Sequence, residues 1–141
     1  MVRESMGDYR KLTFYQKLRL VTQGCNRLIK NWPKVMQAQE IARQIFRSAT
    51  SVGANITEGG GRYEGNEYAR YLVIAQASAN ETDHWLNTAL DVSLRSDEEI
   101  RSLIAPNLEV RKLLPATIKT IRSKSVSKSI RDEQGEYVEE E

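Results

Sequence analysis

The chain has 141 residues and a formal net charge of +2, with 40% hydrophobic and 28% charged residues. This length suits a single domain, and the longest apolar run, residues 71–75, is far shorter than the about 20 residues of a membrane-spanning helix. One cysteine and one histidine exclude an intramolecular disulfide and any multi-cysteine metal site. We therefore expect a cytoplasmic protein without a conventional active site.

Apolar residues in the first half of the chain recur every three or four positions, the spacing of one helix face. The first series stops before Pro33 and the second before the glycines at 59–61, because proline and glycine end helices. The two series are Phe14, Leu18, Val21, Cys25, Leu28 and Trp32, then Ala38, Ile41, Ile45, Ala49, Val52 and Ile56, widened by Ala42 and Phe46. Gly53 lies inside the second helix, so we expect close packing on the third helix there.

Two further helices are expected in the second half. Asn66 can cap a third helix that reaches about Leu94, and residues 96–99 read as a capping box for a fourth. Pro106 and Pro115 lie within the fourth helix and should kink or split it. The buried series are Tyr68, Leu72, Ala75, Ala79, Thr82, Leu86 and Ala89, then Ile100, Leu103, Ile104, Leu108, Leu114, Ile118 and Ile121.

Four amphipathic helices with short connections predict an all-α, antiparallel up-down-up-down four-helix bundle. We assign residues 1–123 to this domain, with a short flexible N-terminal segment to about residue 12. Residues 124–141 contain too few apolar side chains to order and are expected to form a disordered acidic tail. Residues 71–74 are all apolar and point around the whole third helix, which predicts a second apolar contact, between subunits, at Val73 and Ala77.

The middle of the chain resembles the four-helix-bundle family of proteins encoded in 23S ribosomal RNA intervening sequences. The resemblance covers roughly residues 14–121, and its specific part is Asn55, Ile56, Glu58 and Gly59 with the downstream Ser-x-x-Glu at 78–81. This family includes the accessory variability determinant of diversity-generating retroelements. The resemblance implies a ring-shaped homopentamer with a basic surface for RNA or DNA and, in the retroelement branch, a reverse transcriptase partner. Thr57 stands where the family usually has alanine.

Enzymatic chemistry is not indicated by the polar residues. Glu81 and His84 have the Glu-x-x-His spacing of di-iron bundles, but the second histidine that such a site needs is missing. The glycines at 59–61 lack the Lys-Ser/Thr of a nucleotide-binding loop. We expect no metal, no cofactor and no catalytic set, and we interpret five polar residues of the family-like pattern as a structural hydrogen-bond network. These residues are Asn55, Glu58, Glu67, Ser78 and Glu81.

Basic residues favour a nucleic-acid partner by their position. Residues 126–141 carry a net charge of −4, so the rest of the chain carries +6, and Arg19, Gln23, Asn26 and Lys30 lie along one face of the first helix. The expected surface, which would contact phosphates rather than bases, consists of Arg19, Lys30, Arg43, Arg47, Arg62 and Arg70. The alternative is a protein-interaction scaffold, or an intervening-sequence protein that binds no nucleic acid.

Overall fold

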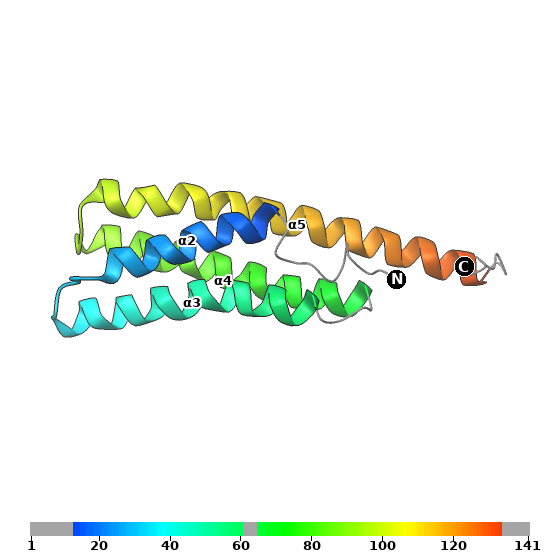
Figure 1. Cartoon of the computed structure of the whole chain (residues 1–141), viewed down its shortest axis with the longest axis horizontal. Coiled ribbons are helices and arrows are strands. Elements are labelled where there is room, and N and C mark those ends of the chain that lie inside the picture. The colour runs from blue at the N-terminus through cyan, green and yellow to red at the C-terminus, as the bar shows by residue number, and fades with distance from the viewer. Residues whose placement is uncertain (1–12, 61–64, 134–141) are drawn as a thin grey trace.

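The computed structural model describes residues 13–60 and 65–133, with side chains up to residue 124 (Figure 1). These residues form four helices, α2 (Thr13–Ile29), α3 (Met36–Gly60), α4 (Gly65–Asp91) and α5 (Asp97–Glu133). Each helix packs on its neighbours in the chain, and α2 also packs on α5, which closes the bundle. The described part of the chain contains no strand, and the expected all-α four-helix bundle is confirmed.

The main series of the first three helices are confirmed as core, because all of their residues are buried. The two residues expected to widen the second series are not part of the core, since Ala42 is only partly buried and Phe46 is 43% exposed. In α5 the buried residues differ from the predicted series near its middle. Asn107 and Val110 are fully buried, whereas Leu108, which we expected in the core, is 39% exposed. The buried face of α5 therefore passes through an asparagine, a residue that a search for apolar periodicity does not count.

Among the side chains that the structure describes, three polar ones are fully buried, namely Ser48, Thr82 and Asn107. The Thr82 hydroxyl donates to Ser48 Oγ at 2.9 Å, and Asn107 Nδ2 donates to the carbonyl of Ala79 at 3.0 Å. The remaining buried side chains form two apolar clusters, one toward each end of the bundle. Ser48, Thr82 and Asn107 connect α3, α4 and α5 between these two clusters, and we call them the polar layer.

Helix α5 continues through both of its prolines, so the expected split does not occur. Proline costs a helix interior about 3 kcal/mol, but Leu103, Val110, Leu114 and Ile118 pack into the bundle on either side of the two rings. This burial holds the helix together. The helix also runs to Glu133, past residue 124 where we expected a disordered tail (Figure 1). Because no glycine or proline follows Pro115 before residue 135, nothing in that stretch ends the helix.

Gly53 does not serve the contact that we predicted for it. A Cβ there would meet only Leu18 of α2, at 3.4 Å, and nothing on α4. The close approach of α3 and α4 lies instead at Gly59, where a Cβ would come within 2.8 Å of Tyr71 Cβ and 3.0 Å of Tyr68 Cδ2. Glycine is thus required at the end of α3 and not at its centre.

The end of α2 is fixed by hydrogen bonds from other elements. Trp32 Nε1 donates to the carbonyl of Ala38 at 2.6 Å, which closes the connection to α3. Arg95, which precedes α5, donates to the carbonyl of Lys30 at 2.6 Å. This is a favourable place for a cation, because the last carbonyls of a helix have no partner within the helix and carry the negative end of its dipole. In the described part of the chain, no helix is long and apolar enough to cross a membrane.

Candidate nucleic-acid interface

The α3–α4 contact contains a row of hydrogen bonds through small polar side chains. Ser51 Oγ and Ser78 Oγ lie 2.9 Å apart, and Asn55 Nδ2 donates to Ser51 Oγ at 3.2 Å and to the Ser51 carbonyl at 2.8 Å. Two of the five residues that we expected in a network, Asn55 and Ser78, are thus joined through Ser51. Sequence reasoning missed Ser51, Ser48 and Thr82 as hydrogen-bonding groups, although small residues at these positions were visible.

The remaining three members of that set are glutamates, one midway along this contact and two at the end where α3 leads into α4. Glu81 forms an ion pair with Arg47 of α3 and accepts a hydrogen bond from Trp85 Nε1 at 3.3 Å. Glu58 lies in the last turn of α3 and Glu67 in the first turn of α4. An acid at the start of a helix interacts favourably with the free backbone N–H groups there.

Two of the predicted nucleic-acid-binding residues already have carboxylate partners. Arg47 is paired with Glu81 and also donates from Nε to Gln44 Oε1 at 2.9 Å. Arg43 lies 3.7 Å from Glu40, and both side chains are well exposed, so this pair is weak. The positive charge of Arg47 is therefore largely compensated within the bundle, whereas that of Arg43 remains open to solvent.

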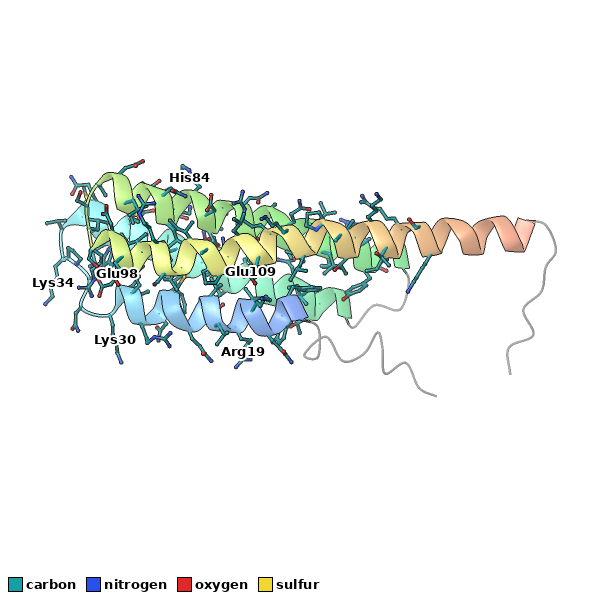
Figure 2. All side chains as sticks on the ribbon, turned by 90° about the horizontal axis from the view of Figure 1, so that it is seen from above. Arg19, Lys30, Lys34, His84, Glu98 and Glu109 are labelled. Atoms are coloured by element: carbon teal, nitrogen blue, oxygen red, sulfur yellow. The ribbon has the colours of Figure 1, made fainter. Side chains whose placement is uncertain are left out.

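Arg19 and Lys30 project from the outer side of α2, and His84 projects from α4 on the opposite side of the bundle (Figure 2). Arg19 borders an open groove of about 470 Å³ between α2 and α3, which we call the α2–α3 groove. No carboxylate is among the described residues that line it, which are Tyr15, Leu18, Arg19, Thr22, Gln23, Asn26, Phe46, Thr50, Gly53, Ala54 and Thr57. Arg70 is exposed on α4, and Arg62 lies outside the described residues.

The structure gives little support for chemistry at Cys25 or His84. Burial raises the pKa of the Cys25 thiol to about 12, so the thiolate that acts as a nucleophile is absent at neutral pH. The ring of His84 lies edge-on to Trp85, with centroids 4.9 Å apart. Within residues 14–60 and 65–124, no three side chains of the metal-binding types gather at one place.

Comparison with known proteins agrees with this geometry. The family model described as 23S rRNA-intervening sequence protein matches residues 10–116. The chain belongs to this family. A crystal structure of a protein with unknown function from the S23 ribosomal protein family of Bacteroides thetaiotaomicron is 29% identical, with a TM-score of 0.67, and the match covers 76% of this chain and 99% of that one. No curated protein matches the chain significantly.

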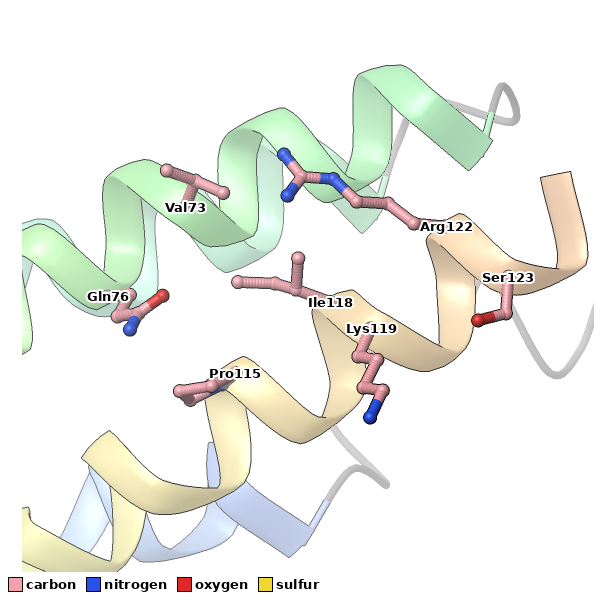
Figure 3. Close-up of a pocket in the computed structure, with 7 residues that line it drawn as sticks. All are labelled: Val73, Gln76, Pro115, Ile118, Lys119, Arg122 and Ser123. Carbon is pink, nitrogen blue, oxygen red and sulfur yellow. The ribbon is translucent and has the colours of Figure 1, made fainter. Parts of the chain in front are cut away.

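Two grooves of this intervening-sequence family protein differ in whether the family match covers their lining residues. The α2–α3 groove lies wholly within the matched residues. A second groove of about 630 Å³ lies between α4 and α5, where Val73 and Gln76 face Ile118 and Arg122 (Figure 3). Its α5 side continues past residue 116 and so beyond the match. Val73, one of the two expected subunit contacts, is 39% exposed at this groove, and Ala77 one turn along α4 is exposed as well.

Proposed function

We propose that the protein is a non-enzymatic, oligomeric nucleic-acid-binding protein. The observation that carries the proposal is the α2–α3 groove, which has Arg19 on its edge and no carboxylate among its described lining residues. Since α2 and α3 run in opposite directions, Lys30 and Arg43 lie one turn beyond Asn26 and Phe46 at the same end of this groove. Lysine and arginine side chains that neutralise phosphates release condensed counterions, which favours binding.

Oligomerisation strengthens this proposal because a few cations per subunit bind weakly alone. A closed ring would repeat the same groove around its axis and multiply the phosphate contacts without any new type of contact. The exposed apolar residues Val73 and Ile74 of α4 support a subunit contact on that helix. We propose a homopentamer, as the family resemblance implies, and we place its subunit contact at Val73 and Ala77 because of the surplus apolar face of α4.

A reverse transcriptase is the partner that we propose for this protein. In the retroelement branch of this family the protein would assist a reverse transcriptase during copying of a template RNA. A gene neighbourhood with a reverse transcriptase and template and variable repeats supports this branch, whereas an insertion within a ribosomal RNA gene supports the other. Co-purification of the protein with that reverse transcriptase is the direct test.

The binding test compares two charge reversals of equal size and equal spacing. Arg19→Glu with Lys30→Glu changes the groove side of α2, and Arg101→Glu with Lys112→Glu changes exposed positions of α5 that are also eleven residues apart. Fluorescence anisotropy with a structured RNA and a duplex DNA, at low and at physiological salt, measures binding. We expect strongly salt-dependent binding that only the first pair abolishes. Wild-type protein that binds neither probe at low salt refutes the proposal and favours a protein scaffold.

Oligomeric state is tested separately by sedimentation equilibrium. Val73→Glu should shift the mass toward the monomer, because the subunit contact would bury an unpaired charge. Leu20→Glu is the matched control, since Leu20 is 64% exposed on α2 and is not part of the proposed contact. A wild-type mass of one subunit at tens of micromolar, or an equal effect of both variants, contradicts the proposed interface.

A further inference from the structure

Phe46 is the one large aromatic side chain of α3, and its position is unexpected for an amphipathic helix. The sequence pattern placed it beside the buried series, yet it is 43% exposed and lies on the wall of the α2–α3 groove. An exposed aromatic ring is a poor choice for a solvated helix face, because it leaves apolar surface in water. A planar or apolar group that covered the ring would remove this surface from water.

The surroundings of Phe46 are polar and suited to hydrogen bonding. Gln23 and Asn26 line the opposite wall from α2, and each amide both donates and accepts hydrogen bonds. Thr50 also lines the groove, but its hydroxyl already donates to the carbonyl of Phe46 at 2.8 Å, so the two amides are the groups that need partners. An apolar protein segment would leave these groups without partners when it covered them, whereas a ligand with a flat face and polar edges would satisfy them.

Small residues of α3 leave space in the α2–α3 groove. Gly53 and Ala54 lie there with Leu18, and a side chain at position 53 would meet only Leu18, at 3.4 Å. Packing between helices therefore does not require glycine at this position. The missing side chain instead leaves space in the groove, which a flat ligand can use.

The charges around the groove favour an anionic ligand. Arg19 is on one edge, and Lys30 and Arg43 lie one helical turn, about 5.4 Å, beyond the wall residues Asn26 and Phe46. Of the carboxylates that the structure describes, only Glu40, 3.7 Å from Arg43, lies beside one of these three cations. No carboxylate lines the described groove. A flat, polar-edged group on an anionic backbone is an unpaired nucleobase of a single-stranded nucleic acid.

We propose that the α2–α3 groove takes an unpaired base of a single strand, stacked on Phe46 with its edge toward Gln23 and Asn26. Arg19, Lys30 and Arg43 contact the phosphates on either side of this base. This inference rests on the proposed function and narrows it, since paired bases in a duplex do not offer their faces to a side chain. The protein therefore prefers single strands or loops over duplexes, with little dependence on the sequence.

The experiment compares three labelled probes of equal length by fluorescence anisotropy. These are a single-stranded DNA, the same strand annealed to its complement, and an abasic strand that keeps the phosphates and lacks the bases. Wild-type protein should bind the single strand about tenfold more tightly than the abasic strand, the loss expected for one base stack. Phe46→Ala should bind both strands with the weaker affinity, and Phe46→Trp should restore the difference.

Two controls make the outcome decisive. Leu20→Ala removes a more exposed apolar side chain of α2 and should leave all three affinities unchanged. Sedimentation of Phe46→Ala at the wild-type mass shows that the groove is not a contact between copies of the chain, and a lower mass overturns the inference in favour of such a contact. Equal affinity of wild type and Phe46→Ala for the single strand, or a wild-type preference for the duplex, also overturns it. The proposed function survives these last two results, because nucleic acid is still bound, and fails only when no probe binds.

Discussion

Alanine substitution at two glycines of α3 should have opposite effects on stability. At Gly53 the new Cβ would make one contact, 3.4 Å from Leu18 Cδ2, which is an ordinary van der Waals distance. Alanine is favoured over glycine in a helix interior by about 1 kcal/mol. We expect Gly53→Ala to raise the free energy of unfolding by about 0.5–1 kcal/mol.

At Gly59 the same substitution meets a fixed obstacle. The new Cβ would lie 2.8 Å from Tyr71 Cβ and 3.0 Å from Tyr68 Cδ2. Tyr71 Cβ is bound directly to its backbone and cannot rotate away, so α3 and α4 must move apart. Overpacking of this kind costs about 1–3 kcal/mol, which exceeds the small helix-propensity gain at a helix end. We expect a net loss of about 1–2 kcal/mol for Gly59→Ala.

Urea unfolding followed by circular dichroism at 222 nm measures both variants, at one protein concentration because oligomers are stabilised by mass action. The two substitutions are chemically identical, so effects of alanine on the unfolded chain cancel in their difference. Stabilisation by both variants, or no effect of Gly59→Ala, would refute the close contact between the end of α3 and Tyr71. It would also remove the structural reason for the glycine in the family-like segment, and a role in binding would then have to explain it.

Three further changes test other parts of the bundle. Asn107→Leu should raise the free energy of unfolding by about 1–2 kcal/mol, since Asn107 Oδ1 is buried without a hydrogen-bond partner and leucine has the same branched shape. A double-mutant cycle on Arg47 and Glu81 should give a coupling of less than about 1 kcal/mol that falls with salt, because both side chains are partly exposed. The raised pKa of Cys25 means that its neutral thiol stabilises the fold below pH 9 and that this contribution is lost as the pH rises toward 12, so Cys25→Ala should flatten the decline in stability above pH 9.

Most of the fold could be predicted from the sequence because three helices repeat their apolar residues without interruption. Proline and glycine mark the ends of these helices, and every residue of their three main apolar series is buried. The fourth helix was harder because Asn107 occupies a core position and two prolines lie within the series. Burial of the neighbouring apolar residues offsets the cost of the prolines, and only the packed structure shows this balance.

The sequence indicated which basic residues could form the candidate site, but not which of them lie together or pair with carboxylates. The stripe from Arg19 to Asn26 follows from helical periodicity, and its members do line one groove. The pairing of Arg47 with Glu81 joins residues 34 positions apart, which no local pattern reveals. Phe46 follows the buried Ile45 directly, so periodicity alone could not decide whether α2 would cover it.

The position of α2 explains why the groove lies where it does. The polar layer of Ser48, Thr82 and Asn107 fixes the register of α3, α4 and α5, because shifting one helix would leave its hydrogen-bonding groups buried without partners. Helix α2 contributes no residue to this layer. Its register is set from the α5 side, where Lys17 pairs with Glu109 and Gly24 faces Leu103. Toward α3 the contacts lie at Leu18 with Gly53 and, after the end of α2, at Trp32 with Ala38. Between these contacts the α2–α3 groove leaves the ring of Phe46 exposed.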